Sequence, residues 1–155
     1  YGFESGQDEA VLLKNRALSA ELKTESAFIY RTRGSCIDEH TGIYANPAIQ
    51  QVINEVLFKN GNDDGPRWSK YYSPFPHSAF ALTLTAIECA IDEWATGVRQ
   101  TIAFTEEEYV NAYVGHDEAL DEFDKATSKY KLLSMILKRV FDNGQYVLVI
   151  TTILY

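Results

Sequence analysis

The chain has 155 residues, of which 46% are hydrophobic and 23% charged, and its net charge is −8 at pH 7. This length and composition predict one globular domain that can bury a core without disulfides or a structural metal. The acidic balance argues against direct binding to nucleic acid or to an anionic membrane, because both require a basic surface.

The two cysteines, Cys36 and Cys89, lie far apart in the sequence and show neither metal-binding nor disulfide spacing. This sparse use of cysteine favours a reducing compartment, and we expect an intracellular protein, nuclear or cytoplasmic. No segment has the length and apolar character that a membrane span requires. Because the chain begins at Tyr1 and its one methionine is Met135, we expect it to be part of a longer protein.

The first half of the chain predicts two helices. Residues 8–22 carry apolar side chains at helical spacing, and residues 45–60 show the strongest helical pattern, with a proline in the first turn. The short apolar run at residues 26–31 predicts a strand or an extended packing segment. Residues 34–44 are rich in turn formers and predict a loop.

The middle of the chain, residues 78–95, predicts the helix around which the others pack. One stripe of apolar side chains repeats at helical spacing, and the opposite side is also apolar, including Leu82 and Cys89. A helix that is apolar nearly all round is usually buried, so we expect only its acidic end to be accessible. The stripe consists of Phe80, Leu84, Ile87, Ile91 and Trp94.

Two further helices are predicted in the second half. Thr105 and Glu108 form a capping box, which marks the start of the first. Gly115 within that helix indicates a close approach to another helix. The last helix begins near residue 128 and ends at Gly144, because glycine is common just after a helix end.

We therefore expect an all-α fold of about five helices in a single domain, residues 1–144, with at most a minor strand pair. The tail, residues 145–155, is uncharged, β-branched and without helical period. Two interpretations of it remain open. Either it forms an edge strand, or it is non-native sequence from a read-through intron, since Gln145-Tyr146-Val147 can be encoded with GTATGT, a common start of fungal introns.

Several segments resemble a known family. They are similar to an uncharacterised helical domain (a domain of unknown function) of mushroom-forming basidiomycete fungi. The segments that carry the resemblance are YANPAIQQVINEVLFKN, a loop with DDG, YYSPFPHSAFALTLTAIECAIDEWATG, TIAFTEEEY and YVGH. The resemblance covers about residues 8–144, and TAIECAIDEWATG is its most specific part. It implies a mostly helical domain, often at the end of longer and partly disordered proteins. It implies no catalytic residue and no cofactor.

One candidate site is an aromatic cluster in the long connection at residues 61–76, where Arg67 and Lys70 also lie. Long connections inside compact domains are often functional, and Trp, Tyr and Arg are the residue types that anchor protein interfaces. The cluster therefore predicts a partner-binding surface. The alternative, that the rings roof the central helix, stays open. The aromatic residues are Trp68, Tyr71, Tyr72 and Phe75.

A second candidate site contains three carboxylates and a histidine: Glu88, Asp92, Glu93 and His116. Glu88 and Asp92 share a helix face, and two acids held close raise the pKa of one of them, as in acid–base pairs. As an alternative function, this pattern predicts an enzyme of unknown reaction with an acidic pocket. The structural alternative is that cations such as Arg99 neutralise the acids at the helix end.

Other chemistry is sparse. The three histidines lack the spacing of a metal-ligand pair, and the chain contains no nucleophile motif and no phosphate-binding glycine loop. Cys36, with Arg33 and His40 nearby, is a candidate for a reactive thiol. We expect no metal and no cofactor. We expect a non-catalytic protein-interaction module of a larger fungal protein, whose partner is a protein.

Overall fold

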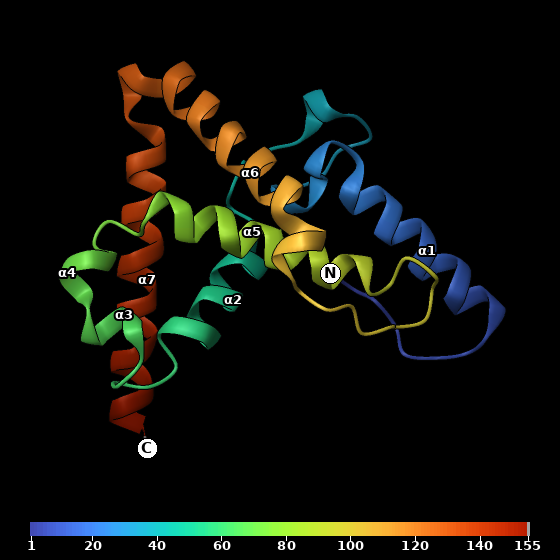
Figure 1. Cartoon of the computed structure of the whole chain (residues 1–155), viewed down its shortest axis with the longest axis horizontal. Coiled ribbons are helices and arrows are strands. Elements are labelled where there is room, and N and C mark those ends of the chain that lie inside the picture. The colour runs from blue at the N-terminus through green and yellow to red at the C-terminus, as the bar shows by residue number, and fades with distance from the viewer. Residues whose placement is uncertain (155) are drawn as a thin grey trace. The chain divides into compact units, whose positions relative to one another are not determined.

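The structure, a computed structural model, describes the backbone of residues 1–154 and the side chains of residues 1–149 (Figure 1). In this part of the chain it is all-α, with seven α-helices and three 3₁₀ helices. The expected fold class is confirmed. The minor strand pair is reduced to one isolated antiparallel bridge between Thr32 and Thr41.

Five of the α-helices are longer than two turns, which is the number that the hydrophobic periodicity predicts. The other two, α3 and α4, have a single turn each and lie in the segment expected to be a loop. In chain order the helices are α1 (Glu9–Lys23), η1 (Thr24–Ile29), η2 (Ile37–Glu39), α2 (Pro47–Leu57), α3 (Asp64–Arg67), α4 (Ser69–Tyr72), α5 (His77–Asp92), α6 (Glu106–Thr127), η3 (Ser128–Tyr130) and α7 (Leu132–Leu154).

The chain forms two compact units, each built from two stretches of sequence. Unit 1 contains Tyr1–Asn46 and Thr85–Val110, and unit 2 contains Pro47–Leu84 and the chain from Asn111 through α7. Helices α5 and α6 each contribute residues to both units. The expectation of a single domain over residues 1–144 stays a prediction.

The core of unit 1 gathers α1, η1 and the second half of α5. The hydroxyl of Ser19 donates to the carbonyl oxygen of Ile91 at 3.2 Å, which fixes α1 against α5. The segment expected to be a strand or an extended run is instead mostly the 3₁₀ helix η1. Glu25 and Ser26 have φ values of 50° and 54°, and this pair of left-handed residues turns the chain so that Phe28 is buried.

The core of unit 2 includes the contact between α2 and α7, where α2 packs obliquely against α7 (Figure 1). The rings of Phe58 and Phe141 meet edge to face, with centroids 5.8 Å apart. The amide of Gln50 donates to the carbonyl oxygen of Val140 at 3.0 Å. Apolar side chains of α2 and α7 bury one face of each helix, as their periodicity predicts: Ile49, Ile53, Leu133, Leu137 and Val140.

Helix α5 is buried on most, but not all, of its circumference. Ile87 and Cys89 are buried as expected, whereas Leu82 is 49% exposed and Ala90 is also exposed. The prediction that helices wrap this element on nearly every side is therefore wrong along one face. An apolar side chain does not by itself require burial, because much of any protein surface is apolar.

Two glycines have roles opposite to those predicted. Gly144 does not end the last helix: α7 continues through Leu154, and a Cβ on Gly144 would lie 2.5 Å from a carbon of the Phe58 ring. Gly115 marks no close approach, because a Cβ there would meet nothing within 4 Å. Residues 145–154 thus continue a helix and do not form the expected edge strand. The intron interpretation of the tail stays a prediction.

Candidate functional site

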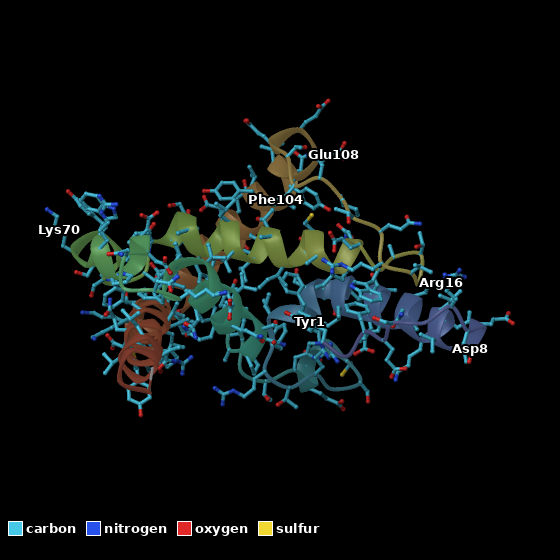
Figure 2. The ribbon with its side chains drawn as sticks, turned by 90° about the horizontal axis from the view of Figure 1, so that it is seen from below. Tyr1, Asp8, Arg16, Lys70, Phe104 and Glu108 are labelled. Atoms are coloured by element: carbon cyan, nitrogen blue, oxygen red, sulfur yellow. The ribbon has the colours of Figure 1, made fainter. Side chains whose placement is uncertain are left out.

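The first candidate is a small exposed surface on α3 and α4, formed by Arg67, Trp68, Lys70 and Tyr71 and called here the aromatic surface. Gly65 lets α3 approach the end of α2, since a Cβ at this position would lie 2.5 Å from the carbonyl oxygen of Leu57. The two single-turn helices then present their side chains outward. Figure 2 shows the Lys70 side chain projecting away from the ribbon.

Each ring of the aromatic surface has a cation close to it. The Arg67 guanidinium carbon lies 5.2 Å from the centre of the Trp68 ring, and the Lys70 ammonium lies 4.9 Å from the centre of the Tyr71 ring. The rings are tilted by 55° with centroids 6.4 Å apart. Trp68 is 44% and Tyr71 64% exposed. Such a pairing of cation and ring is attractive and restricts the side chains to fewer conformations.

The other two predicted aromatic residues turn inward. Phe75 is buried, and its backbone N–H donates to the carbonyl oxygen of Leu137 in α7 at 3.2 Å. Its ring lies edge-on to Phe80 of α5, and Tyr72 is half-buried beside it. The surface and roofing interpretations therefore each describe half of the cluster. Trp68 and Tyr71 face solvent, while Phe75 belongs to the core of unit 2 and Tyr72 lies half-buried beside it.

The second candidate, the acidic end of α5, is compensated by cations. The ammonium of Lys23, at the end of α1, lies 2.6 Å from Oδ1 of Asp92 and 3.4 Å from Oε1 of Glu88. The Tyr109 hydroxyl donates to the other oxygen of Asp92 at 3.1 Å. Sequence reasoning missed Lys23 and Tyr109, because nothing in the sequence shows that α1 ends beside α5.

This network shifts two pKa values. Partial burial by itself lowers the pKa of Lys23, but the hydrogen bond and charge of Asp92, together with Glu88, more than offset it and leave the pKa raised. Burial, followed by hydrogen bonds with Cys89 and Asp92, raises the pKa of Tyr109. Both groups therefore hold their protons more firmly than they would in water.

Glu93 has its own cation. Its Oε2 lies 2.8 Å from Nε of Arg99, which confirms the expected neutralisation by this arginine. Glu88, Asp92 and Glu93 all lie in unit 1, whereas the buried His116 lies in unit 2. As a functional site, this set of four residues stays a prediction.

A cavity of about 610 Å³ in unit 1 is lined by residues of α1, η1 and the loop around η2. Cys36, Arg33 and His40 are among its lining residues, as their proximity in sequence suggests. Nε of Arg33 lies 3.3 Å from Glu21, while its Nη1 is buried without a hydrogen-bond partner in the described part of the chain. The N–H of Gly34 donates to Nδ1 of His40, so a neutral His40 carries its proton on Nε2.

Comparison with known families places the chain. A family model described as Domain of unknown function (DUF6532) matches residues 1–123. The chain belongs to this family. No curated protein and no solved structure gives a significant match.

The DUF6532 match includes the aromatic surface, the acidic end of α5 and the cavity, but not α7.

Two negative findings concern the described residues. Among them, no group of three or more His, Cys, Asp or Glu side chains is arranged to hold a metal ion. No helix in the same range is both long and apolar enough to cross a membrane.

Proposed function

We propose that this DUF6532 domain is a non-catalytic protein-interaction module that binds a partner protein through the aromatic surface. The observation that carries the proposal is the pair of exposed rings, Trp68 and Tyr71, each held beside a cation. Trp, Tyr and Arg are enriched among the residues that dominate binding energy in protein interfaces. Rings already restricted by their cations lose less conformational entropy on binding.

The chemistry of this surface favours a partner segment with an apolar side chain next to a carboxylate. The apolar group would pack on the faces of Trp68 and Tyr71, and the carboxylate would accept hydrogen bonds from Arg67 or Lys70. Asp63 and Asp64 at the start of α3 balance the charge of Arg67 and Lys70, so the carboxylate would be recognised by these hydrogen bonds and not by a net positive surface.

The catalytic alternative at Glu88, Asp92, Glu93 and His116 has weaker support. A general acid or base needs a pKa near the working pH, which requires a carboxyl group that is poorly compensated. Here the ammonium of Lys23 lies 2.6 Å from Asp92 and Nε of Arg99 lies 2.8 Å from Glu93, so both carboxylates already have a cation partner. This arrangement supports a structural role for the acidic end of α5.

The wider setting of the module is part of the same proposal. The resemblance of TAIECAIDEWATG and its neighbouring segments supports an origin in a basidiomycete fungus and a place within a larger protein. The sparse cysteines support an intracellular site of action, nuclear or cytoplasmic. The acidic charge supports a protein partner and argues against direct contact with nucleic acid.

The test is affinity purification of the full-length protein, comparing wild type with Trp68→Ala/Tyr71→Ala by quantitative mass spectrometry. We expect the double variant to lose a specific partner while its melting temperature stays nearly unchanged, because both side chains are exposed. Val56→Ala is the matched control, since Val56 is an exposed apolar residue of α2. Binding of the identified partner is then measured by calorimetry. Equal binding by wild type and double variant, or a large loss of stability, contradicts the proposal.

A further inference from the structure

Helix α7 has a second apolar face in addition to the one that packs in unit 2. Its buried face includes Leu133, Leu137, Val140 and Phe141. Five other apolar side chains of the same helix are 38% to 67% exposed, and all but Val147 share one face: Leu132, Met135, Tyr146 and Val149. At about 100° per residue, these four fall in one stripe that lies opposite the buried face. Exposed apolar groups gathered on one helix face are typical of an interaction surface.

Two opposite charges complete this stripe at its centre. Arg139 and Asp142 are both exposed and fall on the same face. In chain order the stripe consists of Leu132, Met135, Arg139, Asp142, Tyr146 and Val149, with spacings of 3, 4, 3, 4 and 3. The spacing is the same when it is counted from either end. The stripe, called here the α7 stripe, is therefore apolar at both ends and charged in the middle.

A surface with this symmetry is complementary to itself when two copies run in opposite directions. Leu132 of one copy would face Val149 of the other, and Met135 would face Tyr146. Arg139 would face Asp142 twice, once on each side of the two-fold axis. We propose that α7 pairs with α7 of a second copy of this chain, in antiparallel orientation. The alternating 3 and 4 spacing is that of helices that cross at about 20°.

Charge selects the antiparallel orientation. In a parallel pair Arg139 would lie near Arg139 of the other copy and Asp142 near Asp142, and like charges across an interface are unfavourable. In the structure Asp142 is already paired with Lys138 of its own helix at 2.7 Å, and both side chains are exposed. A surface pair of this kind contributes little, and a carboxylate has two oxygens, so Asp142 can accept Arg139 of the second copy as well.

The expected dimer is modest in strength. The stripe runs from Leu132 to Val149, which is only part of α7. A single helix pair of this length buries less surface than the roughly 1,200–2,000 Å² of a standard stable interface. We therefore expect monomer and dimer to exchange at micromolar protein concentrations. The pairing does not depend on the proposed function of the aromatic surface. It also lies outside residues 1–123, the part that matches the DUF6532 family.

Sedimentation equilibrium of the full chain over a range of micromolar concentrations tests the pairing. We expect a concentration-dependent dimer for wild type and a monomer for Met135→Glu. In a dimer of this variant, each copy would place one carboxylate in an apolar end of the interface. The matched control is Val56→Glu on α2, where an equally exposed apolar residue outside the stripe changes in the same way. Circular dichroism confirms that each variant is folded. A wild type that is monomeric throughout, or equal dimerisation of Met135→Glu and the control, overturns the proposal.

Charge exchange tests the register. Arg139→Asp would place two carboxylates opposite each other at both central positions, and we expect the dissociation constant to rise at least about tenfold. The double variant Arg139→Asp/Asp142→Arg restores opposite charges and should recover most of the affinity. Failure of the double variant to associate more tightly than Arg139→Asp alone contradicts the proposed register.

Cross-linking tests the orientation. In a Cys36→Ser background, we expect Met135→Cys mixed with Tyr146→Cys to form a disulfide between chains, because these positions face each other in the antiparallel pair. Met135→Cys by itself should cross-link poorly. Preferential cross-linking of Met135→Cys with itself would indicate a parallel pair and would overturn the proposal.

Discussion

The side-chain amide of Asn15 donates a hydrogen bond to the carbonyl oxygen of Gly97, which lies 2.8 Å away in space and 82 residues later in the chain. The same side chain exchanges two hydrogen bonds with the backbone of Glu4. Asn15 is fully buried, so one amide ties the N-terminal segment and the turn after α5 to α1. Gly97 has a φ of 90° and passes so near Leu12 that a Cβ would lie 2.5 Å from its carbonyl oxygen.

Asn15→Ala is expected to destabilise the protein by about 2–4 kcal/mol, because it removes three hydrogen bonds and leaves buried backbone groups unpaired. The free energy of unfolding in urea measures the effect. The control is Asn111→Ala, at an exposed asparagine of α6, which should change stability by less than about 0.5 kcal/mol. Similar losses for both variants would show that the Asn15 network contributes little.

Ile87→Ala is expected to cost about 2–5 kcal/mol, because Ile87 is buried in α5 and its truncation leaves a cavity. Leu82→Ala removes a similar volume from the same helix, but at a half-exposed position, and should cost less than about 1 kcal/mol. Both are measured by chemical denaturation. A larger loss at Leu82 than at Ile87 would contradict the orientation of α5.

The two helical glycines provide a matched pair. Gly144→Ala should destabilise the protein by about 1–3 kcal/mol, because the new methyl group collides with the buried Phe58 ring. Gly115→Ala meets open space in α6 and should stabilise it, by up to about 1 kcal/mol, because alanine favours the helix. Melting temperatures of the two variants should therefore move in opposite directions, and a shift of both in one direction would contradict the structure.

Periodicity predicted the fold class and the five long helices, because the pattern of apolar residues along a helix is local information. It did not predict what each helix meets. Glycine is favoured both just after a helix end and at a close contact, so the sequence predicts a helix end at Gly144 where α7 in fact continues through Leu154. The outward half of the aromatic cluster and Lys23 beside Asp92 likewise depend on packing between distant segments, which no local pattern specifies.

Stability is expected to fall at alkaline pH, and Tyr44 is one identifiable cause. Burial, followed by the nearby Tyr30, raises the pKa of the Tyr44 phenol from 10.0 to about 12. A raised pKa in the folded state means that the folded protein holds this proton more tightly than the unfolded chain. The stabilisation is therefore fully present below pH 10 and is lost as pH rises from 10 through 12.

Tyr44→Phe removes this titration. Between pH 10 and 12, the unfolding free energy of the variant should fall less steeply than that of wild type, by up to about 1.4 kcal/mol per pH unit. Urea denaturation at pH 9, 10, 11 and 12 gives both slopes. Any difference caused by the lost hydroxyl itself is present already at pH 9 and shifts the whole curve. Parallel curves for the two proteins would rule out Tyr44 as a contributor.

The hydrogen bond from Phe75 to Leu137 joins a residue inside the family match to one beyond it. A chain that ends at Phe123, where the family match ends, would lack α7, whose Phe141 and Gly144 lie against Phe58 and whose Leu137 accepts the N–H of Phe75. Its hydrophobic interior would be open on one side, and aggregation during expression would be the practical result. The family match is thus shorter than the part of the chain that buries the core. A recombinant protein should therefore extend beyond Phe123 and include α7.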